Sequence, residues 1–146
     1  MKFTDATTKD ASAIAEINRL SRRHAMPWLP VVHTPEEDLE FFRDNVLTNQ
    51  TVYVARIADE VVGFIAYQSD WLNHLYVTPE HLRGGVGSKL LSMVQNDSAC
   101  LQLWTFQENH GARAFYKKHG FEEVELTDGV SNEEKTPDVR MTWIKT

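Results

Sequence analysis

Residues 79–94 have the sequence PEHLRGGVGSKLLSMV, and the apolar, aromatic segment WLNHLYV comes directly before them at 71–77, with one threonine between. Segment 71–77 is typical of a β-strand because aromatic and apolar side chains dominate it. After the glycines, the apolar residues recur at the spacing of one helix face: Val86, Leu90, Leu91 and Val94. The sequence therefore predicts a strand, a glycine-rich turn and a helix, in that order.

This order indicates an anion site at the turn. The first backbone N–H groups of a helix have no partner within it, and they lie at the positive end of the helix dipole. Gly84, Gly85 and Gly87 would let a phosphate or pyrophosphate approach them closely. The turn lacks the Gly-Lys-Ser/Thr ending of a P-loop and the Gly-x-Gly-x-x-Gly spacing of dinucleotide-binding proteins. A plain turn without a ligand stays the alternative.

Composition and length narrow the class of protein. A chain of 146 residues can form one domain with a sizeable core, which we expect to span residues 1–146. The net charge of −6 disfavours a nucleic-acid partner, which needs a basic surface. The N-terminus lacks the apolar segment of a signal peptide, and no apolar run is long enough to span a membrane. We therefore expect a cytoplasmic protein without a membrane partner.

The first part of the chain is predicted to form a strand within residues 1–8 and then two helices. Asp10 is suited to cap the first helix. The face of this helix that points to the core would contain Ile14, Ile17, Leu20 and Ser21. Thr34 can cap the second helix, and Glu37 would complete a capping box, which explains Glu36 and Glu37 without a catalytic role. The loop between the helices would either cover the core or form one wall of a substrate pocket.

The remaining strands are predicted from runs of apolar and β-branched residues: 51–57, 61–68, 71–77, 100–106, 121–126 and 139–144. The first three would form an antiparallel meander. In the fourth, we expect Leu101, Leu103 and Trp104 to supply apolar bulk. Asn109 would cap a further helix that ends at Gly120. The polar residues 127–137 would form a hairpin loop, which completes an α+β arrangement.

Two motifs in this order resemble those of the GCN5-related N-acetyltransferases. Their main motif is Gln/Arg-x-x-Gly-x-Gly/Ala, and Gly85-Val86-Gly87 stands at its glycine end. A second motif, Asn-x-x-Ala-x-x-Phe-Tyr-x-x-x-Gly-Phe, is matched by Asn109, Ala112, Phe115, Tyr116, Gly120 and Phe121. The resemblance extends over essentially the whole chain. One departure is Leu82 at the Gln/Arg position, and we hypothesise that Arg83 supplies charge to a phosphate instead.

The resemblance implies a three-layer α+β fold. Its central sheet would be twisted and mostly antiparallel, with about seven strands and about four helices. The strand at 71–77 and the strand at 100–106, fourth and fifth in the sheet, would splay apart to form a V-shaped opening.

The resemblance also implies a function, which is transfer of an acetyl group from acetyl-CoA directly to a primary amine of an unidentified acceptor. No metal is expected. Backbone groups of Leu75 and Val77 would bind the pantetheine arm, and one of their N–H groups would polarise the thioester carbonyl. Asn109 and Tyr116 would also contact the cofactor. The pyrophosphate would lie against Leu82, Arg83, Gly84, Gly85, Val86, Gly87 and Ser88.

Tyr116 resembles the family's general acid, because a phenol with a pKa of roughly 10 keeps a proton that it can give to the CoA sulfur. His74 is a candidate general base. Asp70, Glu108 and a chain of water molecules are weaker alternatives for that role. Cys100, the only cysteine, allows no intramolecular disulfide and no cysteine-based zinc site, and we expect a buried structural thiol rather than an acyl-carrying nucleophile.

The acceptor would be a small molecule or a peptide. A partly apolar pocket is indicated by Trp28, Leu29, His33 and Phe42. Asp128, Glu133 and Glu134 could attract a cationic amine. Homodimerisation is common in such domains and stays open here. Two alternatives also stay open: a non-catalytic acyl-CoA-binding domain of the same fold, and a nucleotide-binding module that uses the glycine turn.

Overall fold

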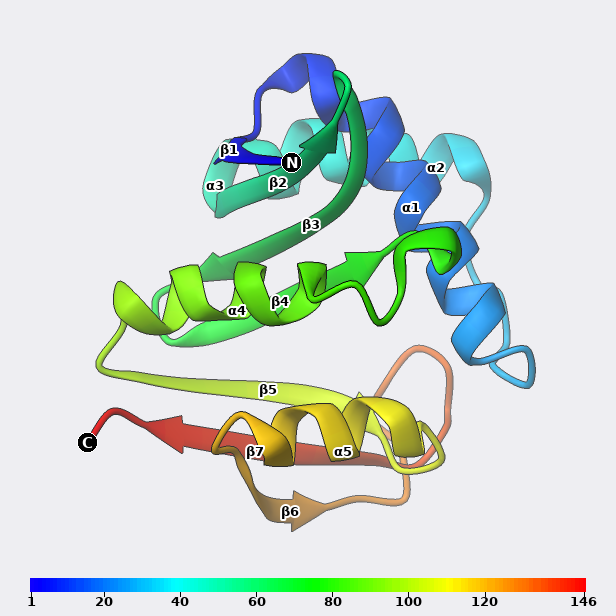
Figure 1. The fold of residues 1–146 in the computed structure, drawn as a ribbon. Helices are drawn as coiled ribbons and strands as arrows, with labels where there is room; N and C mark the ends of the chain where they lie inside the picture. The colour runs from blue at the N-terminus through cyan, green and yellow to red at the C-terminus, as the bar shows by residue number, and fades with distance from the viewer.

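One seven-stranded sheet runs through the computed structural model, which describes residues 1–146, in the order β1-β2-β3-β4-β5-β7-β6 (Figure 1). Its strands are β1 (Lys2–Asp5), β2 (Thr51–Ile57), β3 (Glu60–Gln68), β4 (Trp71–Val77), β5 (Cys100–Phe106), β6 (Glu122–Leu126) and β7 (Asp138–Ile144). Neighbouring strands are antiparallel except β4 and β5, which are parallel. The predicted meander and the mostly antiparallel sheet are thus confirmed.

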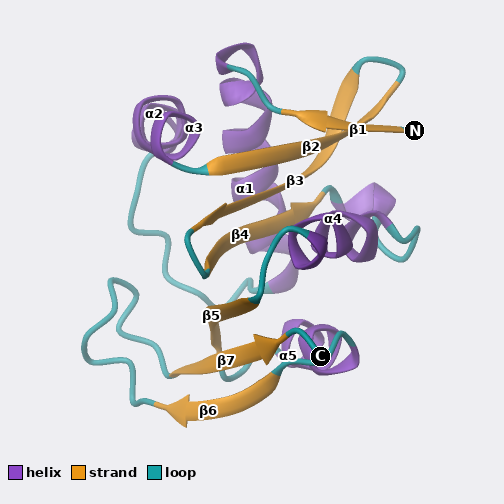
Figure 2. Cartoon of the chain, turned by 90° about the vertical axis from the view of Figure 1, so that its left-hand side faces the viewer, coloured by secondary structure: helices purple, strands orange, loops and turns teal.

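Four helical segments cover the sheet. They are α1 (Ala11–Ala25), α2 (Pro35–Phe41) with its continuation into α3 (Leu47–Asn49), α4 (Val86–Asn96) and α5 (His110–Lys118). A π-helical segment, Phe42–Val46, joins α2 to α3, and short 3-10 helices lie at Thr8–Asp10 and Pro79–His81. Figure 2 shows α2 and α3 on one side of the sheet, and α4 and α5 on the other. No helix has the length and apolar character that crossing a membrane would require.

Two apolar cores lie on opposite faces of β3, whose residues 61–66 are all buried. The larger core joins α4 and α5 to the sheet and contains the predicted helix face: Val86, Leu90, Leu91 and Val94. The smaller core joins α1 and the π-helical segment to β2 and β3, with Ile14, Phe42 and Phe64 at its centre. A strand that is buried on both faces is expected to be apolar throughout, as residues 61–66 are.

The predicted start of the second helix is confirmed. Thr34 Oγ1 accepts a hydrogen bond from the Glu37 backbone N–H (3.1 Å), and the Glu37 carboxylate accepts one from the Thr34 N–H (2.8 Å). These reciprocal bonds form the capping box. The end of α5 is confirmed as well, because Gly120 follows it with a φ of +93°.

Three expectations about burial were wrong. Cys100 and Trp104 are exposed, because they lie on the face of β5 that no helix covers, whereas Leu101 and Leu103 face the core. Successive side chains of a strand point to opposite faces, so Leu103 and Trp104 cannot both be buried on one side. Leu20 is exposed too, since Asn18 and Ser21 take the buried positions of the last turns of α1.

Candidate active site

The strands β4 and β5 separate after one registered pair, Trp71 with Gln102, and Figure 1 shows them diverging toward their C-terminal ends. At the closed end, the Gln102 backbone N–H donates to the Asp70 carbonyl (2.7 Å), and the Gln102 amide donates to the Asp70 carboxylate (2.9 Å). Parallel strands otherwise hydrogen-bond along their length. The predicted splay between these strands is therefore confirmed, and it leaves one edge of β4 without a partner strand.

The free edge of β4 presents backbone groups to this opening. Hydrogen-bonded pairs alternate along antiparallel strands. Because the Thr78 N–H donates to the Val62 carbonyl (2.8 Å), the backbone groups of Leu75 and Val77 point away from β3. The Val77 carbonyl accepts a hydrogen bond from Ser21 Oγ of α1 (2.8 Å). The N–H groups of Leu75 and Val77 consequently face the opening.

The start of α4 has no side-chain cap. Gly85 is the N-cap residue with a φ of +81°, and a Cβ built there would have open space around it. The first backbone hydrogen bond of the helix runs from the Lys89 N–H to the Gly85 carbonyl (3.0 Å). The first N–H groups of α4 are therefore available to a ligand, and they belong to Val86, Gly87 and Ser88.

A cavity of about 1200 Å³ joins the opening to the start of α4; we refer to it as the first cavity. It brings together most residues that the sequence predicted to bind a cofactor: Leu75, Val77, Leu82, Arg83, Gly85, Gly87, Ser88, Asn109 and Tyr116. Gly84 and Val86 do not line it, and the Val86 side chain lies in the larger core. Leu82 lines the cavity with a half-exposed side chain, beside the left-handed backbone of Arg83.

Tyr116 lies in the wall of the first cavity on α5. Its ring contacts Phe115 and Phe121, with ring centroids 5.3 and 5.4 Å away. Burial, together with the neighbouring phenol of Tyr76, raises the pKa of Tyr116 above its usual range. The phenol therefore keeps its proton at neutral pH. Asn109 caps α5 by accepting a hydrogen bond from the Ala112 N–H (3.2 Å), and it lines the same cavity.

His74 lies on β4 among aromatic rings, with ring centroids between 5.1 and 6.5 Å from its own. Burial, and to a smaller degree the charge of Arg22, lowers the pKa of His74 to about 4. The imidazole is therefore neutral at pH 7 and can accept a proton, although it is a weak base. Asp70 and Glu108, the alternative bases, line neither this cavity nor the next.

A second cavity of about 780 Å³ adjoins the first, between α1, α2 and the loop 26–33. Leu29, His33 and Phe42 line it, as the predicted acceptor pocket requires. Trp28 lines neither cavity and instead packs edge-on against Phe106, with ring centroids 6.4 Å apart. Four residues line both cavities: Arg22, Met26, His74 and Glu134.

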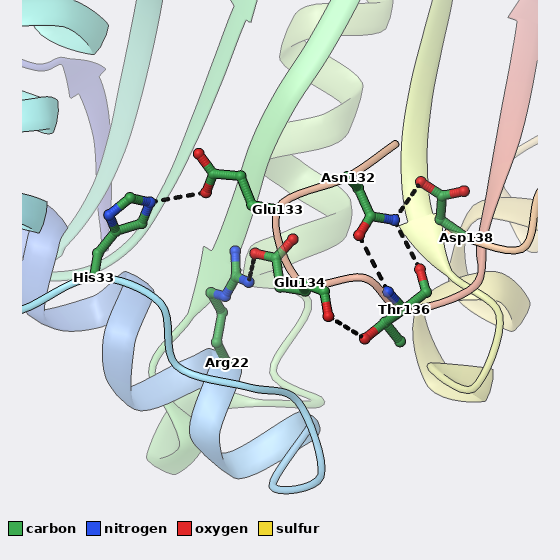
Figure 3. Close-up of polar contacts among 7 residues, drawn as sticks. All are labelled: Arg22, His33, Asn132, Glu133, Glu134, Thr136 and Asp138. Atoms are coloured by element: carbon green, nitrogen blue, oxygen red, sulfur yellow. Dashed lines mark hydrogen bonds and ion pairs between the residues drawn. The ribbon is translucent and has the colours of Figure 1, made fainter. Parts of the chain in front are cut away.

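Residues of the hairpin loop 127–137 line both cavities, and Figure 3 shows the polar contacts that hold this loop. Glu134 forms an ion pair with Arg22 of α1 (3.0 Å), and Glu133 contacts His33 Nε2 (2.8 Å). Within the loop, the Asn132 amide donates to the Thr136 carbonyl (2.7 Å) and to the Asp138 carboxylate (3.1 Å). The contacts of Glu134 and Glu133 join residues that are 112 and 100 positions apart, whereas the contacts of Asn132 are local.

Several polar residues at the site were not predicted from the sequence. Neither Arg22 nor Asn18 was singled out as a site residue. Ser88 Oγ lies 3.0 Å from His119 Nε2, a contact between α4 and the end of α5 that no local pattern indicates. The one available signal was the spacing of Asn18, Ser21 and Arg22, which places three polar residues on the inward side of α1.

Comparison with known proteins identifies the family. Residues 48–123, more than half of the chain, match the family model described as an acetyltransferase (GNAT) domain. The chain belongs to the GNAT acetyltransferase family. It is 28% identical over 93 residues to the uncharacterized N-acetyltransferase MJ1207 of Methanocaldococcus jannaschii, covering 53% of this chain and 41% of that one. It is also 29% identical over 102 residues to the peptidyl-lysine N-acetyltransferase YiaC of Escherichia coli, covering 69% and 68%.

Solved structures share the fold of this GNAT domain. Apo YjaB of Escherichia coli has a TM-score of 0.80 at 19% identity, over 99% of this chain and 98% of that one. PaiA N-acetyltransferase of Thermoplasma acidophilum, in complex with coenzyme A, has a TM-score of 0.74 at 18% identity, over 99% and 100%. The implied fold is thereby confirmed.

Proposed function

We propose that this GNAT domain, acting as a single unit over residues 1–146, transfers an acetyl group from acetyl-CoA directly to a primary amine. The observation that carries the proposal is the opening between β4 and β5, because it combines free backbone groups, an uncapped helix start and a buried phenol in one cavity. Family membership supports acetyl transfer, and the coenzyme A complex of PaiA, which has the same fold, supports the cofactor.

The residues of the first cavity fit such a cofactor. Its pyrophosphate is anionic, and the uncapped N–H groups at the start of α4 favour an anion. The open space beside Gly85 leaves room for close approach of a phosphate. The amide groups of the pantetheine arm would pair with the backbone of Leu75 and Val77, which has no partner strand. Asn109 and Arg83 would supply further polar contacts along the cavity.

When bound, acetyl-CoA would supply a thioester. The amine would take the acetyl group as the C–N bond forms and the C–S bond breaks. The nitrogen would then lose a proton, and the sulfur would gain one. Tyr116 would hold the proton for the sulfur on its Oη, because burial keeps the phenol protonated. Its fixed packing between Phe115 and Phe121 would keep the hydroxyl in place.

The proton of the amine needs a separate acceptor. His74 would accept it directly or through water, since its imidazole is neutral and lines both cavities. Loss of this proton matters because only the neutral amine can attack the thioester.

Peptidyl lysine is one candidate acceptor, because YiaC is named for that activity. The proposal is tested by calorimetric titration with acetyl-CoA and with ATP, followed by measurement of thiol release with a panel of primary amines. We expect binding of acetyl-CoA, no binding of ATP and amine-dependent thiol release. Binding without thiol release for any amine would favour a non-catalytic acyl-CoA-binding domain, and binding of ATP alone would contradict both.

A further inference from the structure

The charged side chains of the first cavity are separated by the sheet. Its carboxylates belong to the loop between β6 and β7 and to the residue that follows this loop: Asp128, Glu134 and Asp138. Figure 2 shows this loop on the side of α2, opposite α4 and α5. Arg83, directly before α4, and Lys118, at the end of α5, also line the cavity and form no ion pair. The α4 side of the cavity therefore favours an anionic ligand.

The end of α5, where Lys118 lies, is fixed to α4 at two points. Ser88 Oγ lies 3.0 Å from His119 Nε2, and the Gln95 side-chain amide donates a hydrogen bond to the His119 carbonyl (3.0 Å). The His119 ring also packs against Phe115, with ring centroids 4.6 Å apart. The backbone of Lys118, one residue before His119, is thus held beside α4, while its side chain is exposed.

One face of α5 lines the first cavity and ends at Lys118. This face contains Gly111, Ala112, Phe115 and Lys118, whose spacing of three and four residues places them on the same side of the helix. Phe115 lies against the start of α4, since a Cβ built on Gly87 would be 3.6 Å from its ring. The wall that α5 contributes therefore passes the first N–H groups of α4 and ends at a cation.

The neighbouring lysine differs in both respects. Lys117 Nζ lies 3.6 Å from the Glu123 carboxylate, and its side chain lines neither cavity. Lys118 lines the first cavity and has no such counter-charge in the protein. An ammonium group without a protein partner, at the edge of a cavity with an uncapped helix start, is suited to a phosphate.

Acetyl-CoA carries a third phosphate in addition to its pyrophosphate. This group is bonded to the 3′ oxygen of the ribose, at the end of the molecule away from the thioester. We propose that Lys118 binds this 3′-phosphate, so that the cavity distinguishes coenzyme A from a coenzyme that lacks it. The inference rests on the proposed function, because it assigns a further subsite for the same cofactor.

The test compares two ligands that differ only in this phosphate. Calorimetric titration of the full chain would use coenzyme A and 3′-dephospho-coenzyme A at low ionic strength. We expect coenzyme A to bind about threefold to fivefold more tightly, the size of one partly exposed charge contact. Because salt screens such a contact, the ratio of the two affinities should fall as the ionic strength rises. Equal affinities at low ionic strength would mean that Lys118 is only a solvated side chain, and would overturn the inference.

Two adjacent variants locate the effect. Lys118→Gln should weaken the binding of coenzyme A by about threefold and leave the affinity for dephospho-coenzyme A unchanged. The matched control, Lys117→Gln, removes the neighbouring charge that lies outside the cavity and should keep the wild-type ratio of affinities. An equal loss for both ligands in Lys118→Gln, or an equal change of the ratio in the two variants, would contradict the assigned contact.

Phosphorus NMR provides a reading that does not depend on affinity. The second ionisation of a phosphate monoester has a pKa of about 6, and a neighbouring ammonium group lowers this pKa because it stabilises the dianion. The 3′-phosphate of bound coenzyme A should therefore titrate at a lower pH in wild type and Lys117→Gln than in Lys118→Gln. Identical titration in all three proteins would refute the contact.

The titrations also separate this inference from the proposed function. Binding of the two coenzymes with equal affinity overturns the 3′-phosphate subsite and leaves the proposed function standing. If neither coenzyme binds, the proposed function is contradicted, and the subsite falls with it. A preference for coenzyme A that persists unchanged in Lys118→Gln overturns the assignment to this lysine, although it agrees with the proposed cofactor.

Discussion

The two adjoining cavities are built from different parts of the chain. The first cavity contains the backbone groups at the free edge of β4 and at the uncapped start of α4, with Tyr116 in its wall. The second cavity presents charged side chains from α1, α2 and two loops. Backbone groups recognise features common to a whole class of ligands, whereas side chains can differ from one relative to the next. The contrast is expected if members of the family share the cofactor but differ in the acceptor that they bind.

The largest expected effect follows from removing the phenol that would give a proton to the sulfur. Tyr116→Phe should lower kcat by about 100-fold, because a general acid typically contributes 10²–10⁴-fold. Its affinity for acetyl-CoA should stay within about twofold of wild type, since the ring still packs between Phe115 and Phe121. Thiol release and calorimetry would measure the two quantities. Tyr67→Phe, outside both cavities, is the matched control, and an equal loss of kcat there would refute the assignment.

A backbone change in the first cavity should have the next largest effect. Gly85 has a φ of +81°, where an alanine costs about 1–2 kcal/mol. Gly85→Ala should therefore weaken acetyl-CoA binding by about tenfold, as the start of α4 shifts to relieve the strain. Gly84→Ala is a close control, because a Cβ there would lie 3.5 Å from the His81 carbonyl, an ordinary contact, and the φ is not positive. Similar losses in the two variants would show that the backbone conformation of Gly85 is not the cause.

The same contrast explains how much of the molecule could be predicted from the sequence. The order of strand, glycine turn and helix is a local pattern, so the start of α4 and its exposed N–H groups were predictable. The motif around Asn109 and Tyr116 is also local. Residues of both sets line the first cavity, as the family resemblance implied, although Gly84 and Val86 do not.

The second cavity depends on contacts between distant residues. Arg22 and Glu134 are 112 positions apart, and His33 and Glu133 are 100 apart, so no local pattern indicates that they meet. The exposure of Cys100 and Trp104 has a similar origin. Alternation along β5 separates its two faces, but only the packing of α1 and α2 against β2–β4 decides which face stays uncovered.

His74, which lines both cavities, gives a prediction for the pH dependence of the free energy of unfolding. Burial lowers the pKa of His74 from 6.5 to about 4, so between these values the unfolded chain binds a proton that the folded protein does not. The free energy of unfolding should therefore fall as the pH is lowered through this window. Between pH 7 and pH 5.5 the loss from this group should be about 1 kcal/mol.

Denaturant unfolding at the two pH values would measure this loss. His74→Gln should lose about 1 kcal/mol less than wild type over the interval, because glutamine does not titrate. The control His110→Gln changes an exposed residue of α5 and should keep the loss of wild type. An identical pH dependence in His74→Gln and wild type would mean that His74 is not kept neutral by burial, and its assignment as a neutral base would fall with it.

The smallest expected effect concerns the contribution of side-chain charge in the first cavity to the affinity for acetyl-CoA. Arg83 lines this cavity beside Leu82, which occupies the position of the family's polar residue. Arg83→Gln should weaken acetyl-CoA binding by about threefold, the size of one partly exposed charge contact. Because salt screens such contacts, the difference between variant and wild type should shrink as the ionic strength rises. Arg23→Gln removes the same charge from the second cavity and should leave acetyl-CoA affinity unchanged. If Arg83→Gln also leaves it unchanged at low salt, the backbone alone recognises the pyrophosphate, and the contrast between the two cavities becomes sharper.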